Sequence, residues 1–97
     1  MIALEFTGKI AENAVVKRVG EMMRLVFQVT VIRFVKQSDG TMRPKYTTVC
    51  CTKNGTCAAD AHFRKGQQIF VRGDVRIEKD DAGEPQLHCH VWQFELL

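Results

Sequence analysis

Apolar and polar side chains alternate along most of this chain, which is the pattern of half-buried β-strands. Polar and glycine-containing stretches interrupt the alternation and divide the chain into separate strands. The pattern predicts five main strands, at residues 2–10, 22–34, 45–53, 67–78 and 86–97. Gly8 is expected to mark a bulge or bend in the first of them. Residues 12–19 are expected to continue that strand irregularly before a turn at Gly20 and Glu21.

Residues 62–77 give the most informative local pattern. A short helix is expected to end at Lys65 and Gly66, because glycine commonly follows the last turn of a helix. An amphipathic strand follows at once. Its two faces are expected to hold Ile69, Val71, Gly73, Val75 and Ile77 inward, and Phe70, Arg72, Asp74 and Arg76 outward. Arginines on the outer face suggest a small barrel whose surface meets something negatively charged.

The second and third strands carry the other predicted inward residues. Alternation places Leu25, Phe27, Val29 and Val31 on one face of the second strand, and Val49 and Cys51 inward on the third. A polar hairpin loop is expected at residues 36–44, with Asp39 and Gly40 as its turn. A second polar loop is expected at residues 79–85.

The connections between the strands define the expected fold. Asn54 and Gly55 end the third strand, and Thr56 is typical of an N-cap for a short helix at residues 57–63. Five strands with one helix between the third and the fourth follow the order of the OB-fold, a five-stranded Greek-key barrel. The sequence therefore predicts an all-β OB-fold, with residues 1–97 forming a single domain.

The charge of the 97-residue chain is weakly basic, with a net value of +3. Residues 1–48 hold eight basic and four acidic side chains, whereas residues 49–97 hold six and seven. Such a balance permits nucleic-acid binding without requiring it. A signal peptide and a membrane-spanning apolar run are not visible, so a cytoplasmic protein is expected.

The four cysteines are expected to be reduced structural thiols. Cys50 and Cys51 are adjacent and would point to opposite faces of a strand, which discourages a bond between them. The chain contains no C-x-x-C spacing, and His88 and His90 share a strand face that Cys89 does not. We therefore predict neither a metal site nor a cofactor.

With its elements placed, the chain resembles the bacterial single-stranded-DNA-binding protein family and its tail-less relative, primosomal replication protein N. The resemblance is carried by Phe6-Thr-Gly-Lys-Ile10, Phe27-Gln-Val-Thr-Val31, Gly55 with Ala58-Ala59, Phe63-Arg-Lys-Gly66, Ile69-Phe-Val-Arg-Gly-Asp-Val75 and the ending from His90 to Leu97. It implies single-stranded DNA binding in replication, recombination or repair. It also implies assembly into a homo-oligomer, a dimer or a tetramer.

Binding of this kind requires a positive groove for the phosphates and exposed aromatic rings on which bases stack. The candidate contacts are Arg24, Arg33, Phe34, Lys36, Arg43, Lys45, Tyr46, Phe70, Arg72 and Arg76. Trp92, the only tryptophan, is assigned to packing or to an interface. Exposed apolar side chains such as Val26, Ile32 and Phe34 add to the expectation of an oligomer.

The chain departs from the family at its stacking positions. Alignment through Gly55 places Thr48, Asn54 and Asp80 where larger relatives have aromatic residues. The loop from Glu78 to Glu84 is acidic and would repel phosphates. The sequence also ends with its last strand, whereas the single-stranded-DNA-binding proteins usually carry a long tail that recruits enzymes. We therefore expect weaker binding, dominated by charge.

Two other classes of function remain to be weighed. An OB-fold module that contacts proteins of a replication-restart or conjugation complex, with DNA binding weak or lost, is the alternative. Catalysis is disfavoured, because Asp80, Asp81 and Glu84 have no partner that would tune them for acid–base chemistry. The thiol of Cys51 has no identifiable base beside it.

Overall fold

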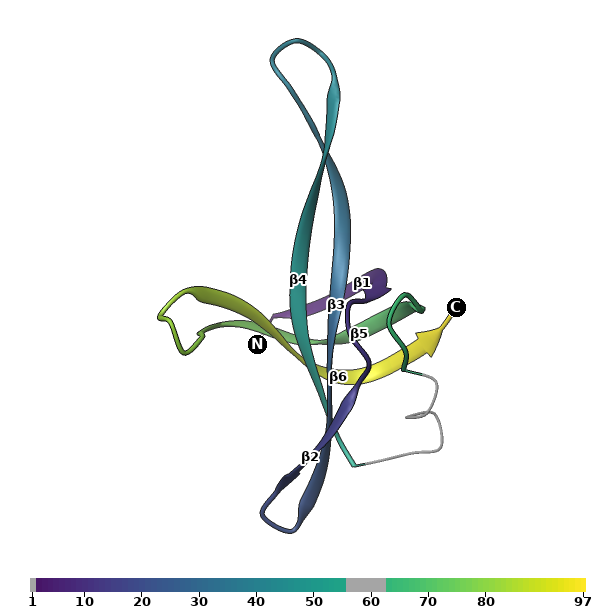
Figure 1. Cartoon of the computed structure of the whole chain (residues 1–97), viewed down its shortest axis with the longest axis vertical. Helices are drawn as coiled ribbons and strands as arrows, with labels where there is room; N and C mark the ends of the chain where they lie inside the picture. Colours follow the sequence, from purple (N-terminus) through teal and green to yellow (C-terminus); the bar gives the residue numbers. More distant parts are fainter. Residues whose placement is uncertain (1, 56–62) are drawn as a thin grey trace.

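The structure is a computed structural model that describes residues 2–55 and 63–97. These residues form the strands β1 (Ala3–Ile10), β2 (Val15–Val19), β3 (Met22–Lys36), β4 (Met42–Asn54), β5 (Gln68–Lys79) and β6 (Pro85–Leu96). The strands follow the order β1-β5-β6-β4-β3-β2 in one sheet, and β1 also pairs with β3. This last pairing closes β1, β5, β6, β4 and β3 into a barrel (Figure 1).

The barrel confirms the predicted fold class. β4 and β6 run parallel, and the other neighbouring strands run antiparallel, which gives the Greek-key barrel of an OB-fold. The expected set of five strands was incomplete, because residues 15–19 form the separate strand β2, which pairs with β3. The predicted helix and its N-cap fall on residues 56–62, outside the described part of the chain, apart from Phe63 at its end.

Apolar side chains from all five barrel strands fill the interior. Phe63, which precedes β5, is buried among them, with its ring 4.9 Å from the rings of both Phe27 and Phe94 in edge-to-face contact. The other buried apolar residues are Ile10, Leu25, Val29, Val49, Cys51, Ile69, Val71, Val75, Cys89 and Val91. Full burial of a Val, Leu, Ile or Phe side chain contributes about 1.5–3 kcal/mol, so this core holds the barrel together.

The predicted inward faces are confirmed except at the strand ends. Leu25, Phe27, Val29, Val49 and Cys51 are buried, as are the first four residues predicted inward on β5. Val31 is only half-buried, and Ile77 is 72% exposed. The reason is that β3 and β5 continue past the end of the barrel, so Val31 packs against the core only in part and Ile77 extends beyond it.

Two glycines allow neighbouring strands to approach closely. A Cβ atom at Gly8 would overlap the carbonyl oxygen of Thr30, and one at Gly73 would overlap that of His90. Gly8 was expected to mark a bulge or a bend, and the β1–β5 pairing excludes the bulge because it runs through Gly8 without a shift. Gly8 lies where β1 crosses onto β3 to close the barrel. The register shift occurs instead beside Gly73, between β5 and β6.

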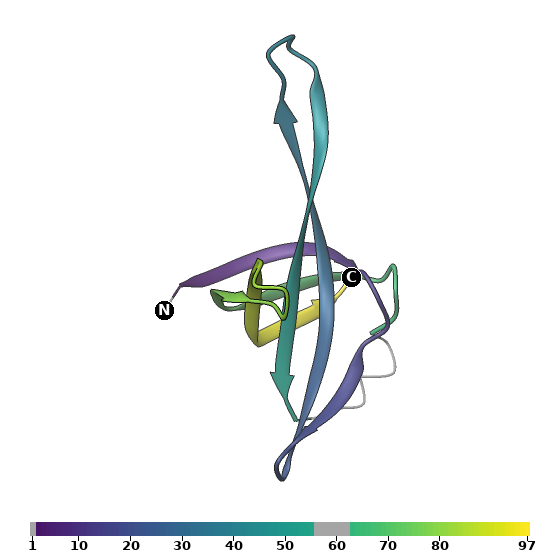
Figure 2. The same ribbon diagram turned by 60° about the vertical axis from the view of Figure 1, so that its left-hand side comes forward.

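The β3–β4 hairpin extends far beyond the barrel and forms one end of a molecule 54 Å long (Figures 1 and 2). Its cross-strand pairs continue as far as Lys36 and Met42. The predicted loop at residues 36–44 was therefore too long, and the turn occupies only residues 37–41. Pro44 is compatible with β4 because that part of the strand has a single neighbour. We call residues 31–47 the finger.

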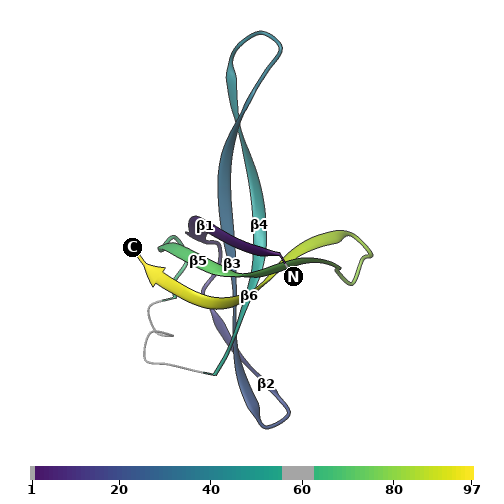
Figure 3. The same cartoon turned by 180° about the vertical axis from the view of Figure 1, so that it is seen from behind.

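The β2–β3 hairpin projects from the opposite end of the barrel, as Figure 3 shows from behind. Within residues 2–55 and 63–97, no helix is long and apolar enough to cross a membrane.

Candidate nucleic-acid interface

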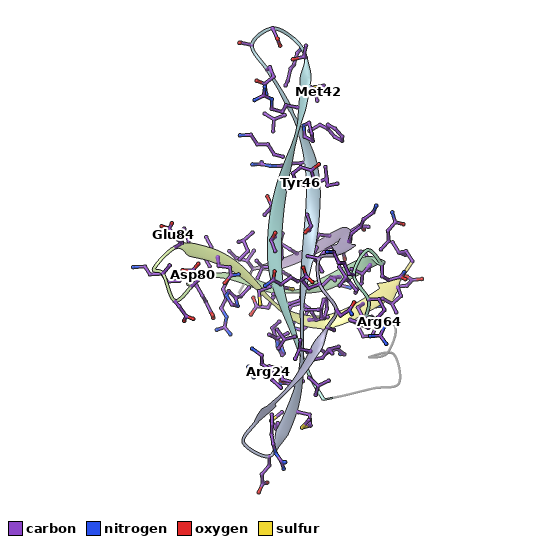
Figure 4. The ribbon with its side chains drawn as sticks, in the orientation of Figure 1. Arg24, Met42, Tyr46, Arg64, Asp80 and Glu84 are labelled. Atoms are coloured by element: carbon purple, nitrogen blue, oxygen red, sulfur yellow. The ribbon has the colours of Figure 1, made fainter. Side chains whose placement is uncertain are left out.

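One face of the finger is apolar and aromatic. The register places Ile32 opposite Tyr46 and Phe34 opposite Pro44, and residues directly opposite one another point to the same side of a sheet. Tyr46 is 66% exposed and Phe34 is 65% exposed. Figure 4 labels Tyr46 on the finger, with Met42 nearer its tip. Neighbouring exposed apolar side chains mark a surface that binds a partner.

The opposite face of the finger is basic. Arg33 lies directly opposite Lys45, and Arg43 lies opposite Val35, one pair further along. Like charges at directly opposite positions destabilise a strand pair. The ion pairs found among the described residues involve other cations. The basic face of the finger is therefore suited to an anionic partner.

Asp39, the single carboxylate of the finger, is hydrogen-bonded within the turn. It accepts hydrogen bonds from the Thr41 hydroxyl at 2.6 Å and from the Thr41 backbone N–H at 2.9 Å. Both hydrogen bonds lower the pKa of Asp39, and the one from the hydroxyl has the larger effect. The carboxylate thus stabilises the turn.

Over the barrel, the outer face of β3 and β4 is polar and largely uncharged. It continues the apolar face of the finger through Gln28, Thr30, Thr48, Cys50 and Thr52. At its far end the Arg24 Nε donates a hydrogen bond to the Asn54 Oδ1 at 3.3 Å. Lys17 of β2 lies directly opposite Arg24. Lys36 belongs to the same face at the tip of the finger. This outer face of β3 and β4 therefore has cations at both ends.

The predicted contacts on β5 lie on a different face. Phe70, Arg72 and Arg76 are on the outer side of β5, which pairs with β1 and β6 and not with β3 or β4. The Arg72 Nε lies 3.5 Å from the Glu5 Oε1, and the Arg76 Nε lies 3.0 Å from the Glu78 Oε1. Both charges are therefore partly neutralised within the protein.

The structure thus divides the ten predicted contacts into three groups. The finger brings together Arg33, Phe34, Lys36, Arg43, Lys45 and Tyr46; Arg24 lies at the other end of the β3–β4 face; and Phe70, Arg72 and Arg76 lie apart on β5. Their contact with DNA stays a prediction for each group.

Two cations of the β3–β4 face were not identified from the sequence. Lys9 is paired with Thr30, and a shallow pocket of about 190 Å³ lies between them and Ile32. Lys17 was missed because residues 12–19 were interpreted as irregular. The β-branched residues Val15, Val16 and Val19 around it, which favour a strand, were the available signal. No sequence signal could have placed Lys9, because its position depends on barrel closure.

The strand β6 adds two histidines beside this face, with His88 next to Cys50 and His90 next to Thr52. The His88 Nδ1 lies 3.6 Å from the Glu78 Oε2, and its Nε2 lies 3.2 Å from the Gln86 Oε1. In the described part of the chain, no three His, Cys, Asp or Glu side chains are grouped so as to hold a metal ion.

Three of the cysteines are described, and each is a free thiol. Cys51 and Cys89 are buried at paired positions of β4 and β6. A hydrogen bond with Cys89 is the main cause that raises the pKa of Cys51, and burial is the second. Burial also raises the pKa of Cys50. The same hydrogen bond lowers the pKa of Cys89. The raised pKa values of Cys50 and Cys51 disfavour the thiolate, which is the reactive form. Trp92 is 42% exposed and lies where the β5–β6 register shifts.

The closed barrel with this strand order is an OB-fold, and solved structures show which class of OB-fold it resembles. It is similar to the Plasmodium falciparum SSB in complex with ssDNA, with a TM-score of 0.78, 14% identity and coverage of 100% of this chain and 93% of the other. The small single-stranded DNA-binding protein of Streptomyces coelicolor matches with a TM-score of 0.74, 14% identity and coverage of 99% and 94%.

The wild-type single-stranded DNA-binding protein of Thermus aquaticus gives a TM-score of 0.73 and 16% identity. The match covers 98% of this chain but only 49% of that protein, so the chain spans about half of its length. No protein-family model matches the sequence, and no curated protein matches it. The chain therefore has the fold of the single-stranded DNA-binding proteins.

Proposed function

We propose that the protein binds single-stranded DNA without catalysing a reaction. The observation that carries this proposal is the finger, in which Phe34 and Tyr46 are exposed at diagonal positions on one face. Aromatic rings of this kind stack on bases at about 1–3 kcal/mol per base without reading their sequence. Lys36 lies on the same face, and Lys9, Lys17 and Arg24 lie along its continuation over the barrel. These cations are placed to contact phosphates.

The cellular role proposed with this activity is replication, recombination or repair of DNA in the cytoplasm, within a primosome or a similar assembly.

We also propose a homo-oligomer, either a dimer or a tetramer. Over residues 3–8, no described strand pairs with the second edge of β1. Ile2 and Leu4 beside this edge are 64% and 46% exposed. Size-exclusion chromatography with light scattering tests this, and a monomer at all concentrations would contradict it.

An OB-fold module that contacts proteins is the second candidate. A specific observation favours it, namely an apolar cleft of about 560 Å³ lined by Ile2, Leu4, Val75, Ile77 and Leu87. The cleft lies where β1 and the β5–β6 hairpin pass the end of the barrel. It is separate from the finger, so the two candidates predict effects of different substitutions.

Fluorescence anisotropy with a labelled oligo-dT, measured from low to moderate salt, tests the DNA-binding proposal. We expect binding that weakens as salt rises, because cations on the protein replace ions condensed on the phosphates. A complete lack of binding at low salt would overturn the proposal and favour the protein-interaction module. The matched RNA oligomer, measured in parallel, determines the preference between DNA and RNA.

A further inference from the structure

Only one of the four cations of the finger lies on its aromatic face. Residues 31–47 contain four basic side chains and one carboxylate, and that carboxylate is bonded to Thr41. Lys36 lies on the aromatic face, opposite Met42. The other three cations lie on the opposite face, where Arg33 and Lys45 are directly paired. This concentration of like charge destabilises the free ribbon.

The geometry of a two-stranded ribbon separates these two groups. Side chains at successive positions leave a strand on opposite sides, so Phe34 and Arg33 point away from each other across the sheet. A DNA strand whose bases stack on Phe34 and Tyr46 lies along one side of the ribbon. Its phosphates beside those bases are therefore remote from Arg33, Arg43 and Lys45.

We propose that the basic face of the finger, made by Arg33, Arg43 and Lys45, binds the phosphodiester backbone of a second nucleic-acid segment. This inference rests on the proposed function, since it takes the aromatic face to be occupied by the first segment. The second segment is recognised through its phosphates alone, because the basic face presents no exposed aromatic ring. The finger then lies between two stretches of nucleic acid.

The number of short oligonucleotides bound per protomer tests this proposal. Isothermal titration at low salt with an oligo-dT of about eight nucleotides, within the usual size of an OB-fold site, is expected to give two per protomer. R33A–R43A–K45A is expected to give one, with the affinity of the remaining site unchanged. F34A–Y46A is also expected to give one, and this remaining site should have the steeper salt dependence.

A matched control removes three positive charges elsewhere. R64A–K65A–K79A replaces exposed cations outside the finger (Figure 4 labels Arg64), and it should still bind two oligonucleotides. Thermal melting of every variant verifies that the barrel is folded. A longer oligo-dT that binds once per protomer would show that one strand supplies both segments, whereas two such oligomers would show separate strands. Both results support the basic face as a second site.

One short oligonucleotide per wild-type protomer would overturn the second site while leaving the proposed function intact. The same holds if R33A–R43A–K45A weakens a single class of sites without changing the number bound. A lack of any binding would remove the proposed function itself. The two failures are therefore distinguishable in one set of titrations.

Discussion

The barrel and the finger are built from the same two strands but differ in what surrounds their side chains. In the barrel, β3 and β4 have neighbours on both sides, and their inner residues such as Val29 and Val49 are buried. In the finger they pair only with each other, and both faces of the ribbon are open to solvent. The barrel side chains therefore supply stability, and the finger side chains are available for binding.

The largest expected effect follows from opening the barrel core. Phe63→Ala removes the ring that touches both Phe27 and Phe94, and a substitution of this kind costs about 3–5 kcal/mol. Urea denaturation measures the decrease in unfolding free energy. Because Phe63 lies outside the finger, we expect any F63A protein that remains folded to bind oligo-dT as the wild type does. A change in unfolding free energy of less than about 1 kcal/mol would contradict the assignment of Phe63 to the core.

Removing the aromatic rings of the finger should give the opposite result. F34A–Y46A is expected to weaken oligo-dT binding by about 1–3 kcal/mol for each base that no longer stacks, while the unfolding free energy changes by less than about 0.5 kcal/mol per substitution. Anisotropy and urea denaturation measure the two quantities. Ile77→Ala, which shortens an exposed apolar side chain of β5, is the control and should leave DNA binding unchanged. Equal affinity of F34A–Y46A and wild type would remove the finger from the stacking site.

A smaller effect is expected from the arginines of β5. R72A–R76A should flatten the log–log salt dependence by at most about 0.7 for each phosphate that an arginine no longer neutralises. R33A–K45A should flatten it more, because Arg72 and Arg76 lie beside Glu5 and Glu78 whereas the finger cations face no described carboxylate. The slopes come from anisotropy titrations at several salt concentrations. A larger change for R72A–R76A would reverse this ranking and place β5 in the binding face.

The smallest effect concerns the turn of the finger. The hydrogen bonds from Thr41 lower the pKa of Asp39 below its ordinary value of 3.8. The ionised carboxylate therefore stabilises the turn above pH 3.8, and this contribution disappears as the pH falls through the lowered pKa. In T41V the hydroxyl is gone, so the pKa of Asp39 should rise toward 3.8 while the barrel melts as before. NMR titration of the Asp39 carboxyl measures it, and an unchanged pKa would show that the hydroxyl has no such effect.

The sequence predicted the barrel better than it predicted the finger. Period-2 alternation identified the inner residues Leu25, Phe27, Val29, Val49 and Cys51, because each lies on a strand with one buried face. The same period cannot tell where a strand leaves the barrel. Ile77 was therefore placed inside, although it is exposed, and residues 42–44 were interpreted as loop rather than as an open ribbon.

The candidate site shows a similar division. Arg33, Phe34, Lys45 and Tyr46 were identified from residue type and from the resemblance to a family, but their arrangement on two opposed faces required the β3–β4 register. The cations of β5 could not be distinguished from those of the finger, because residue order does not reveal which carboxylates lie beside them. Lys9 joined the face only through closure of the barrel, which is a long-range contact.

The most direct test of the finger as the binding surface is a map of where DNA binds. Backbone NMR spectra of the 97-residue protein, titrated with oligo-dT, locate the residues whose signals move. We predict that the largest shifts occur in the finger and along the outer residues of β3 and β4, with little change in β5. Shifts confined to β5 and β1, with the finger unaffected, would contradict it.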